Sequence, residues 1–212
     1  MIKLIICDLD GTLVDSSDDL TNALNYAIEP CALVKLTVAQ TKNLVGEGIT
    51  KLLENLLGPE CHDLHALVLD RFMSYYSDHL LDFTVPYPGV VKTLNDLSSF
   101  RKAVISNKRE SLSKAVLEGL GLLQYFDLVL GSDSVGEKKP SPRPLMKVME
   151  TLACQPTETV IVGDSNFDIQ AGRAAGTSTC AVTYGYRDAR LLKDADMYVD
   201  RFEDLLRLLT VQ

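Results

Sequence analysis

The stretch Leu4-Ile5-Ile6-Cys7-Asp8-Leu9-Asp10-Gly11 decides how the rest of this sequence is interpreted. A short apolar run that stops at acidic residues and a glycine is typical of a buried parallel strand that ends in a functional turn. Side chains two positions apart in an extended chain point the same way, so Asp8 and Asp10 can flank one ligand. Two close carboxylates repel each other, and a divalent cation is the natural compensation. Gly11 allows the backbone to turn sharply beside that ligand.

Similar apolar runs recur along the chain and predict a parallel sheet. They lie at residues 103–106, 126–130, 160–164 and 180–182, and apolar residues at helical spacing separate them. Strands that alternate with helices of this length indicate an α/β fold, with a doubly wound, Rossmann-like parallel sheet as its core. In open sheets of this kind the ligand binds at the carboxyl ends of the strands.

Residues 15–85 break this alternation, because their pattern predicts one helix after another and no convincing strand. Thr37 followed by Gln40 predicts a capping box at a helix start, and Gly58 with Pro59 predicts a helix end. The segment closes at Pro86-Tyr87-Pro88-Gly89, a turn-rich candidate hinge. We therefore expect residues 1–14 and 86–212 to form the core, and residues 15–85 to form an inserted helical cap.

Composition narrows the class of protein. The chain has 212 residues, of which 46% are apolar, so it can bury a sizeable core. Its net charge of -8 and its lack of a basic cluster disfavour binding to nucleic acid or to an anionic membrane. The sequence shows no signal peptide and no membrane span, and its five cysteines are scattered. We expect a cytoplasmic protein that is a monomer or a homodimer.

Two further segments place polar groups where strands are expected to end or helices to begin. In Ser106-Asn107-Lys108, the hydroxyl and the nearby backbone N–H groups can hold phosphate oxygens. In Lys138-Lys139-Pro140, the proline stiffens the chain beside Lys139, whose charge can neutralise a nucleophile and a phosphate together. Each segment alone also has an ordinary explanation as the start of a helix.

The segment Val160-Ile161-Val162-Gly163-Asp164 ends another apolar run with a carboxylate. An unpaired carboxylate at the end of a buried strand is costly, and a metal ion removes that cost. Asp168, four residues later, can bind amides at the start of the next helix or reach the metal through water. Because all four polar segments follow the same rule of position, we interpret them as one site.

Taken together and in this order, these motifs resemble those of the haloacid dehalogenase-like hydrolases, and within them the phosphoglycolate phosphatase group. The resemblance covers nearly the whole chain. It implies a Rossmann-like sheet, a helical cap inserted after the first motif, Mg²⁺ as cofactor and a small phosphorylated metabolite as substrate. It further implies that Asp8 is the nucleophile and that Asp10 is the acid and base. The residues implied to bind phosphate are Ser106, Asn107 and Lys139, and those implied to hold magnesium are Asp8, Asp10 through its backbone carbonyl, Asp164 and Asp168.

The expected cap also contains candidate substrate-reading residues. The segment Gly46-Glu47-Gly48 follows a helical pattern, so we interpret it as a flexible cap loop near the substrate rather than a dinucleotide-binding motif. Lys51, just beyond it, could meet a substrate carboxylate such as that of 2-phosphoglycolate. Arg71, Arg109 and Arg187 are further candidates for that contact.

Two other functions remain open from the sequence. A sugar-phosphate mutase would share Asp8, Asp10 and magnesium but return the phosphoryl group to a sugar. A catalytically silent binding or regulatory protein would keep the fold without the reaction. A true dehalogenase is disfavoured, because the resemblance implies that such enzymes use no magnesium and lack the second aspartate present here at position 10.

Overall fold

A computed structural model describes the backbone of residues 1–210, and their side chains except those of residues 59, 60, 62 and 210. Its main feature is a six-stranded parallel sheet in the order β5-β4-β1-β6-β7-β8. The strands are β1 (Leu4–Cys7), β4 (Arg101–Ile105), β5 (Leu128–Leu130), β6 (Thr159–Gly163), β7 (Ser178–Val182) and β8 (Met197–Val199). The α/β, doubly wound parallel sheet expected from the sequence is confirmed.

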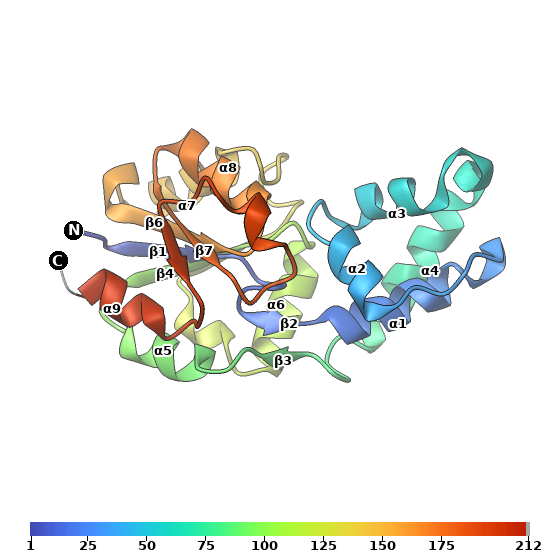
Figure 1. Ribbon diagram of the computed structural model, residues 1–212, viewed down its shortest axis with the longest axis horizontal. Helices are drawn as coiled ribbons and strands as arrows, with labels where there is room; N and C mark the ends of the chain where they lie inside the picture. Colours follow the sequence, from blue (N-terminus) through green and yellow to red (C-terminus); the bar gives the residue numbers. More distant parts are fainter. Residues whose placement is uncertain (211–212) are drawn as a thin grey trace.

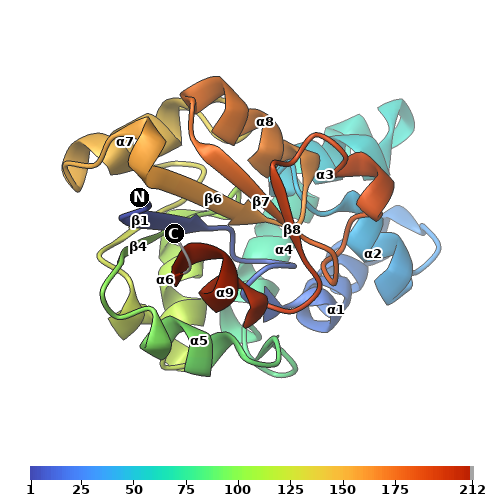
Figure 2. The same cartoon turned by 60° about the vertical axis from the view of Figure 1, so that its left-hand side comes forward.

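Helices cover both faces of this sheet, and the alternation along β1 shows why (Figure 2). Ile5 and Cys7 pack with residues of α5 (Val90–Asp96), α6 (Glu110–Gly119) and α9 (Asp204–Thr210). Leu4 and Ile6 pack on the other face with residues of α7 (Arg143–Thr151) and α8 (Asn166–Ala175). A strand that is buried on both faces has to be apolar throughout, as the first run of the sequence is.

Four helices lie together beyond the end of the sheet at which β1 stops (Figure 1). They are α1 (Ser17–Ala27), α2 (Val38–Leu44), α3 (Ile49–Leu57) and α4 (His65–Asp78). The predicted capping box of Thr37 and Gln40 is present at the start of α2, and Gly58 ends α3 with a positive φ. The helix α4 has 14 residues, and no helix within residues 1–210 is long and apolar enough to cross a membrane.

The two connections between these helices and the sheet run side by side. The short strands β2 (Val14–Asp15) and β3 (Val85–Pro86) pair in antiparallel orientation, so Asp15 and Val85 are extended rather than helical. We keep residues 15 and 85 as the proposed ends of the cap. The connection places the first cap helix directly after the loop that carries Asp8 and Asp10.

Candidate active site

Neighbouring strands bring the predicted residues together at one edge of the sheet. Asp8 follows β1, Ser106 follows β4 and Asp164 follows β6, and β1 lies between the other two strands. Lys139 comes from the loop between β5 and α7. Because the carboxyl ends of parallel strands meet at the same edge, segments far apart in sequence converge here.

Lys139 is buried between two carboxylates. Its Nζ lies 2.8 Å from Oδ1 of Asp8 and 2.7 Å from Oδ1 of Asp168, and it donates a further 2.7 Å hydrogen bond to the carbonyl of Ile105. The Lys139 side chain is only 1% exposed. All three ammonium protons can therefore be satisfied inside the protein, which fixes the charge at one position.

Asp168 is held from its other side by the start of α8. Its Oδ2 accepts hydrogen bonds from the backbone N–H and the hydroxyl of Ser165 in a capping box. Both oxygens of Asp168 therefore accept hydrogen bonds from protein groups. In this arrangement Asp168 orients Lys139 and caps the helix at the same time.

Burial and crowding shift the proton affinities of this cluster. Burial, opposed by Lys139 and assisted by the nearby Asp168, raises the pKa of Asp8 to about 7. Burial and the charges of Asp8 and Asp168 raise the pKa of Asp164 well above its ordinary value. Burial would lower the pKa of Lys139, but the two carboxylates beside it more than offset that effect and raise it.

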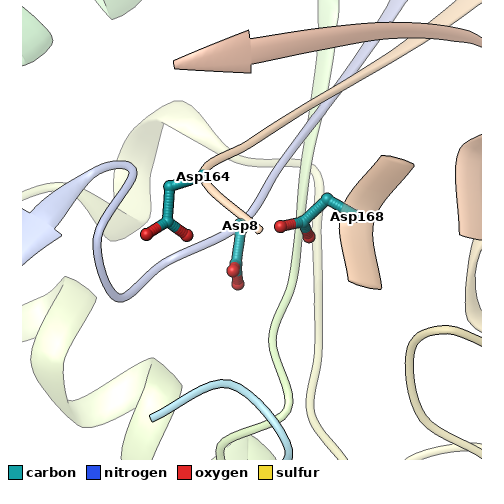
Figure 3. A group of neighbouring side chains, drawn as sticks. All are labelled: Asp8, Asp164 and Asp168. Atoms are coloured by element: carbon teal, nitrogen blue, oxygen red, sulfur yellow. The ribbon is translucent and has the colours of Figure 1, made fainter. Parts of the chain in front are cut away.

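The cluster fits a divalent cation. Carboxylate oxygens of Asp8, Asp164 and Asp168 all lie within 4.8 Å of one another, and Figure 3 shows the three side chains converging on one space. Within residues 1–210, Oδ2 of Asp8 and Oδ1 of Asp164 accept no hydrogen bond from protein side chains or backbone. An all-oxygen donor set with excess negative charge suits a hard cation, so this cluster can bind a metal ion.

The backbone around Asp164 is packed so closely that only glycine fits at two positions. A Cβ on Gly11, which has φ +83°, would lie 2.3 Å from Oδ2 of Asp164, and one on Gly185 would lie 2.2 Å from its Cβ. The backbone N–H of Tyr186 donates a 2.6 Å hydrogen bond to Oδ2 of Asp164. The turn residue Gly11 therefore serves the close approach that the sequence suggested.

Asp10 lies on the cap side of Asp8 and has its own cation. Its Oδ1 is 2.6 Å from Nζ of Lys108 and also accepts a hydrogen bond from the hydroxyl of Ser16. Lys108 Nζ in turn donates a 2.8 Å hydrogen bond to the hydroxyl of Tyr76, a buried residue of α4. This contact joins the sheet end to the cap.

The two predicted phosphate-binding residues of the segment after β4 differ in what they contact. Ser106 is buried and is one of the residues that line the cavity, and its hydroxyl oxygen accepts a 3.2 Å hydrogen bond from the backbone N–H of Lys108. The side-chain amide of Asn107 donates instead to the carbonyls of Gly46 and Lys139, at 2.7 and 2.9 Å. The side chain of Asn107 therefore connects the cap loop to the lysine loop in this conformation.

Three core side chains hold the cap loop by its backbone carbonyls. Arg187 donates to the carbonyls of Asn43 and Val45, both at 2.5 Å, and Lys138 donates to that of Glu47, also at 2.5 Å. The side-chain amide of Asn107 donates to the carbonyl of Gly46, which lies between Val45 and Glu47 in sequence. We call Asn107, Lys138 and Arg187 the cap latch.

The glycines of the cap loop fit this close approach. Gly48 has φ +81°, and a Cβ there would lie 2.8 Å from the carbonyl oxygen of Asn107. A Cβ on Gly46 would lie 3.0 Å from Arg187. Gly46 and Gly48 line the cavity, as the sequence suggested, whereas Glu47 and Lys51 are not among the residues that line it. Lys51 pairs instead with Glu54 at 3.0 Å on an exposed face of α3.

The site opens into a cavity of about 130 Å³ between the sheet and the cap. This volume is below the roughly 300–1,000 Å³ of pockets for drug-sized ligands, so it favours a small leaving group. Cap side chains supply a mostly apolar wall, and charged groups gather on the core side. The apolar and aromatic lining residues from the cap include Leu20, Leu24, Val45, Ile49, Phe72 and Tyr76.

Several functional contacts were not identified from the sequence. Lys108 and Lys138 adjoin predicted residues, so their positions carried a signal that was not used. Tyr76 and Tyr186 stand in segments without any motif, because their contacts arise only when distant elements pack. Arg187 was considered as a substrate contact, but both of its terminal nitrogens bind cap carbonyls.

Comparisons with known proteins show the family of this chain. The model of the haloacid dehalogenase-like hydrolase family matches residues 5–182. The phosphoglycolate phosphatase of Aquifex aeolicus is 38% identical over 98% of this chain and 97% of its own length, and that of Chromobacterium violaceum is 40% identical over 98% and 96%. The crystal structure of a predicted phosphoglycolate phosphatase from Haemophilus somnus 129PT superposes with a TM-score of 0.92, at 30% identity, over 98% of this chain and 97% of that one. The chain therefore belongs to the haloacid dehalogenase-like hydrolase family.

Proposed function

We propose that this protein is a magnesium-dependent phosphatase that hydrolyses 2-phosphoglycolate through a phosphorylated Asp8. That it is a phosphoric monoester hydrolase follows from its family and from the near-complete match to phosphatases at 38–40% identity. The name that these relatives share carries the choice of substrate. The geometry supports the reaction type, because a nucleophile, an acid and a fixed cation meet beside one small cavity.

Asp8 is placed to attack phosphorus. Lys139 and the backbone N–H of Leu9 hold its Oδ1, at 2.8 and 2.7 Å, which orients the carboxylate and leaves Oδ2 for the attack. In the first step Oδ2 forms a bond to phosphorus while the bond from phosphorus to the ester oxygen breaks. The covalent step divides one difficult displacement into two easier ones.

Asp10 supports both steps by moving one proton. Its protonated carboxyl gives the proton to the departing ester oxygen, which leaves as an alcohol. The carboxylate then takes a proton from the water that attacks the phosphorus of the phosphorylated Asp8, which releases phosphate and restores both aspartates. Proton transfer by a positioned side chain contributes about 10²–10⁴-fold to the rate.

Positive charge near the phosphoryl oxygens lowers the repulsion between two anions. Lys139 supplies one charge from a buried, fixed position beside Asp8. Magnesium, which Asp8, Asp164 and the backbone carbonyl of Asp10 would hold, supplies Lewis-acid stabilisation of the phosphoryl oxygens when bound. Ser106, which lines the cavity, adds a hydroxyl. We propose that Asp168 acts through Lys139, because both of its oxygens accept hydrogen bonds from the protein.

A phosphate-release assay over a panel of small phosphomonoesters with Mg²⁺ tests this function. We expect 2-phosphoglycolate to give the highest kcat/KM. The panel should contain a hexose 1-phosphate, analysed for isomerised sugar phosphate as well as for free phosphate. Isomerised product would establish a mutase, and absence of turnover on every ester would indicate a silent binding protein; either result would contradict the proposal.

A further inference from the structure

Lys108 is a buried cation beside the proposed acid. It follows Ser106 and Asn107 at the end of β4, and its side chain is only 7% exposed. Its Nζ lies 2.6 Å from Oδ1 of Asp10, a distance typical of an ammonium paired with a carboxylate. Lys108 is also one of the residues that line the cavity, so it presents an ammonium group there.

The ammonium of Lys108 has one donor left for a ligand. It is 2.6 Å from Oδ1 of Asp10 and 2.8 Å from the hydroxyl of Tyr76, and no further partner within residues 1–210 accepts from it. An ammonium carries three donors. A buried donor without a partner is costly, so a ligand atom that accepts from it gains affinity.

The other cations around the cavity are placed differently. Lys138 and Arg187 donate to carbonyls of the cap loop, so they hold the loop in place. Arg109 lines the cavity but is exposed at the start of α6. Of the cations that line the cavity among the described residues, Lys108 alone is both buried and in contact with Asp10.

The contact with Asp10 fixes which part of a substrate Lys108 can reach. Asp10 has to approach the ester oxygen, because it gives that oxygen a proton. In 2-phosphoglycolate only one carbon separates the ester oxygen from the carboxylate. A cation 2.6 Å from Asp10 is therefore within reach of that carboxylate. The apolar cap wall offers a carboxylate no compensation, and burying an unpaired charge there is costly.

We propose that Lys108, supported by Tyr76, is the residue that recognises the anionic leaving group, and so selects carboxylated phosphomonoesters over neutral ones. This inference rests on the proposed function. Lys108 contacts the substrate on its leaving side, whereas Lys139 serves the phosphoryl group. Lys51, on the exposed face of α3, has no part in it.

The test compares two substrates of nearly equal size, 2-phosphoglycolate and 2-hydroxyethyl phosphate, in which a neutral hydroxymethyl group replaces the carboxylate. Lys108→Met and Lys108→Gln are assayed with the wild type, and Arg109→Met and Lys51→Met serve as matched controls. We expect either Lys108 variant to lower the ratio of the two kcat/KM values by about 10–100-fold, the range of a lost hydrogen bond to a charged group. The ratio cancels any common loss that follows from freeing Asp10.

The outcomes distinguish a failure of the proposed function from a failure of the role proposed for Lys108. A wild type that does not prefer 2-phosphoglycolate contradicts the proposed function. A wild type that prefers it, with parallel losses on both substrates in the Lys108 variants, overturns the role of Lys108 alone. A selective loss in Arg109→Met and none in Lys108→Met would assign the contact to Arg109 and would also overturn the proposed role of Lys108. If both neutral variants fail to fold, Lys108→Arg must keep the preference, and its loss with unchanged activity on the neutral ester contradicts the proposal.

Discussion

The ammonium of Lys139 lies 2.8 Å from Oδ1 of Asp8, and the lysine side chain is only 1% exposed. The same ammonium is 2.7 Å from Asp168, so one buried charge serves two carboxylates. This relationship explains why a lysine far from Asp8 in sequence belongs to the same proposed site. It also couples catalysis to stability, because neither partner can be removed without leaving buried charge unpaired.

Replacing Lys139 by alanine should therefore affect two measurements. We expect turnover to fall by roughly 10²–10³-fold, as when one preorganised charge-stabilising donor is removed. We also expect the free energy of unfolding to fall by about 3–5 kcal/mol, because Asp168 loses its buried partner. Lys3→Ala is the matched control, since Lys3 pairs with Glu158 on the exposed surface, where an ion pair contributes about 0–1 kcal/mol. Full activity in a folded Lys139→Ala protein would exclude the assigned role.

The stability gained from magnesium should depend on pH. Burial raises the pKa of Asp8 from 3.8 to about 7, so between these pH values the metal-free folded state holds a proton that the unfolded chain has released. The contribution of protonated Asp8 to stability is therefore present at low pH and is lost as pH rises from about 4 to about 7. A cation has to displace that proton below pH 7, so Mg²⁺ should bind more tightly at pH 8 than at pH 5.5.

Thermal unfolding with and without Mg²⁺ at these two pH values measures the effect. At a concentration of about 100 Kd the ion should stabilise the fold by about 2.7 kcal/mol. We expect a clear rise of Tm at pH 8 and a smaller one at pH 5.5 for the same added concentration. Asp164→Asn is the control, and its shift should be small at both pH values. Equal shifts of the wild type at the two pH values would argue against a cation at this cluster.

The cap latch should matter for every substrate alike. Arg187→Met removes the donors to the carbonyls of Asn43 and Val45. We expect kcat/KM to fall by about 10-fold for 2-phosphoglycolate and for 2-hydroxyethyl phosphate in parallel, because loss of a charge-assisted hydrogen bond weakens closure over the site rather than recognition. Arg190→Met, in the same loop, is the control, since Arg190 pairs with Asp188 on the surface. A loss on 2-phosphoglycolate alone would instead make Arg187 a substrate-reading residue.

The position of the core residues could be predicted from the sequence because it depends on local rules. An apolar run that stops at Asp8, and another that stops at Asp164, mark strand ends, and parallel strands bring their ends together. The edge strand β8 (Met197–Val199) was not identified, since its three residues carry no distinct pattern. Its place depends on pairing with β7.

The contacts between cap and core could not be predicted in the same way. The pairing of Lys108 with Tyr76 and that of Arg187 with the cap loop depend on how the inserted helices dock, and no spacing rule encodes it. Lys51 is an example, because its position in sequence suggests a substrate contact, whereas in the structure it pairs with Glu54 on α3. The sequence suggests only flexibility at Gly46 and Gly48, whereas the structure shows that these glycines also allow the loop to approach the core closely.

The central claim is that Asp8 carries the phosphoryl group during turnover. It is tested most directly by acid-quenching the enzyme within its first turnovers of substrate with Mg²⁺, and by locating the phosphorylated peptide by mass spectrometry. We predict one phosphoryl group on Asp8 of the wild type, and none on a folded, inactive Asp8→Asn protein. A phosphoryl group on another residue, or near-normal turnover by Asp8→Asn, would contradict the account.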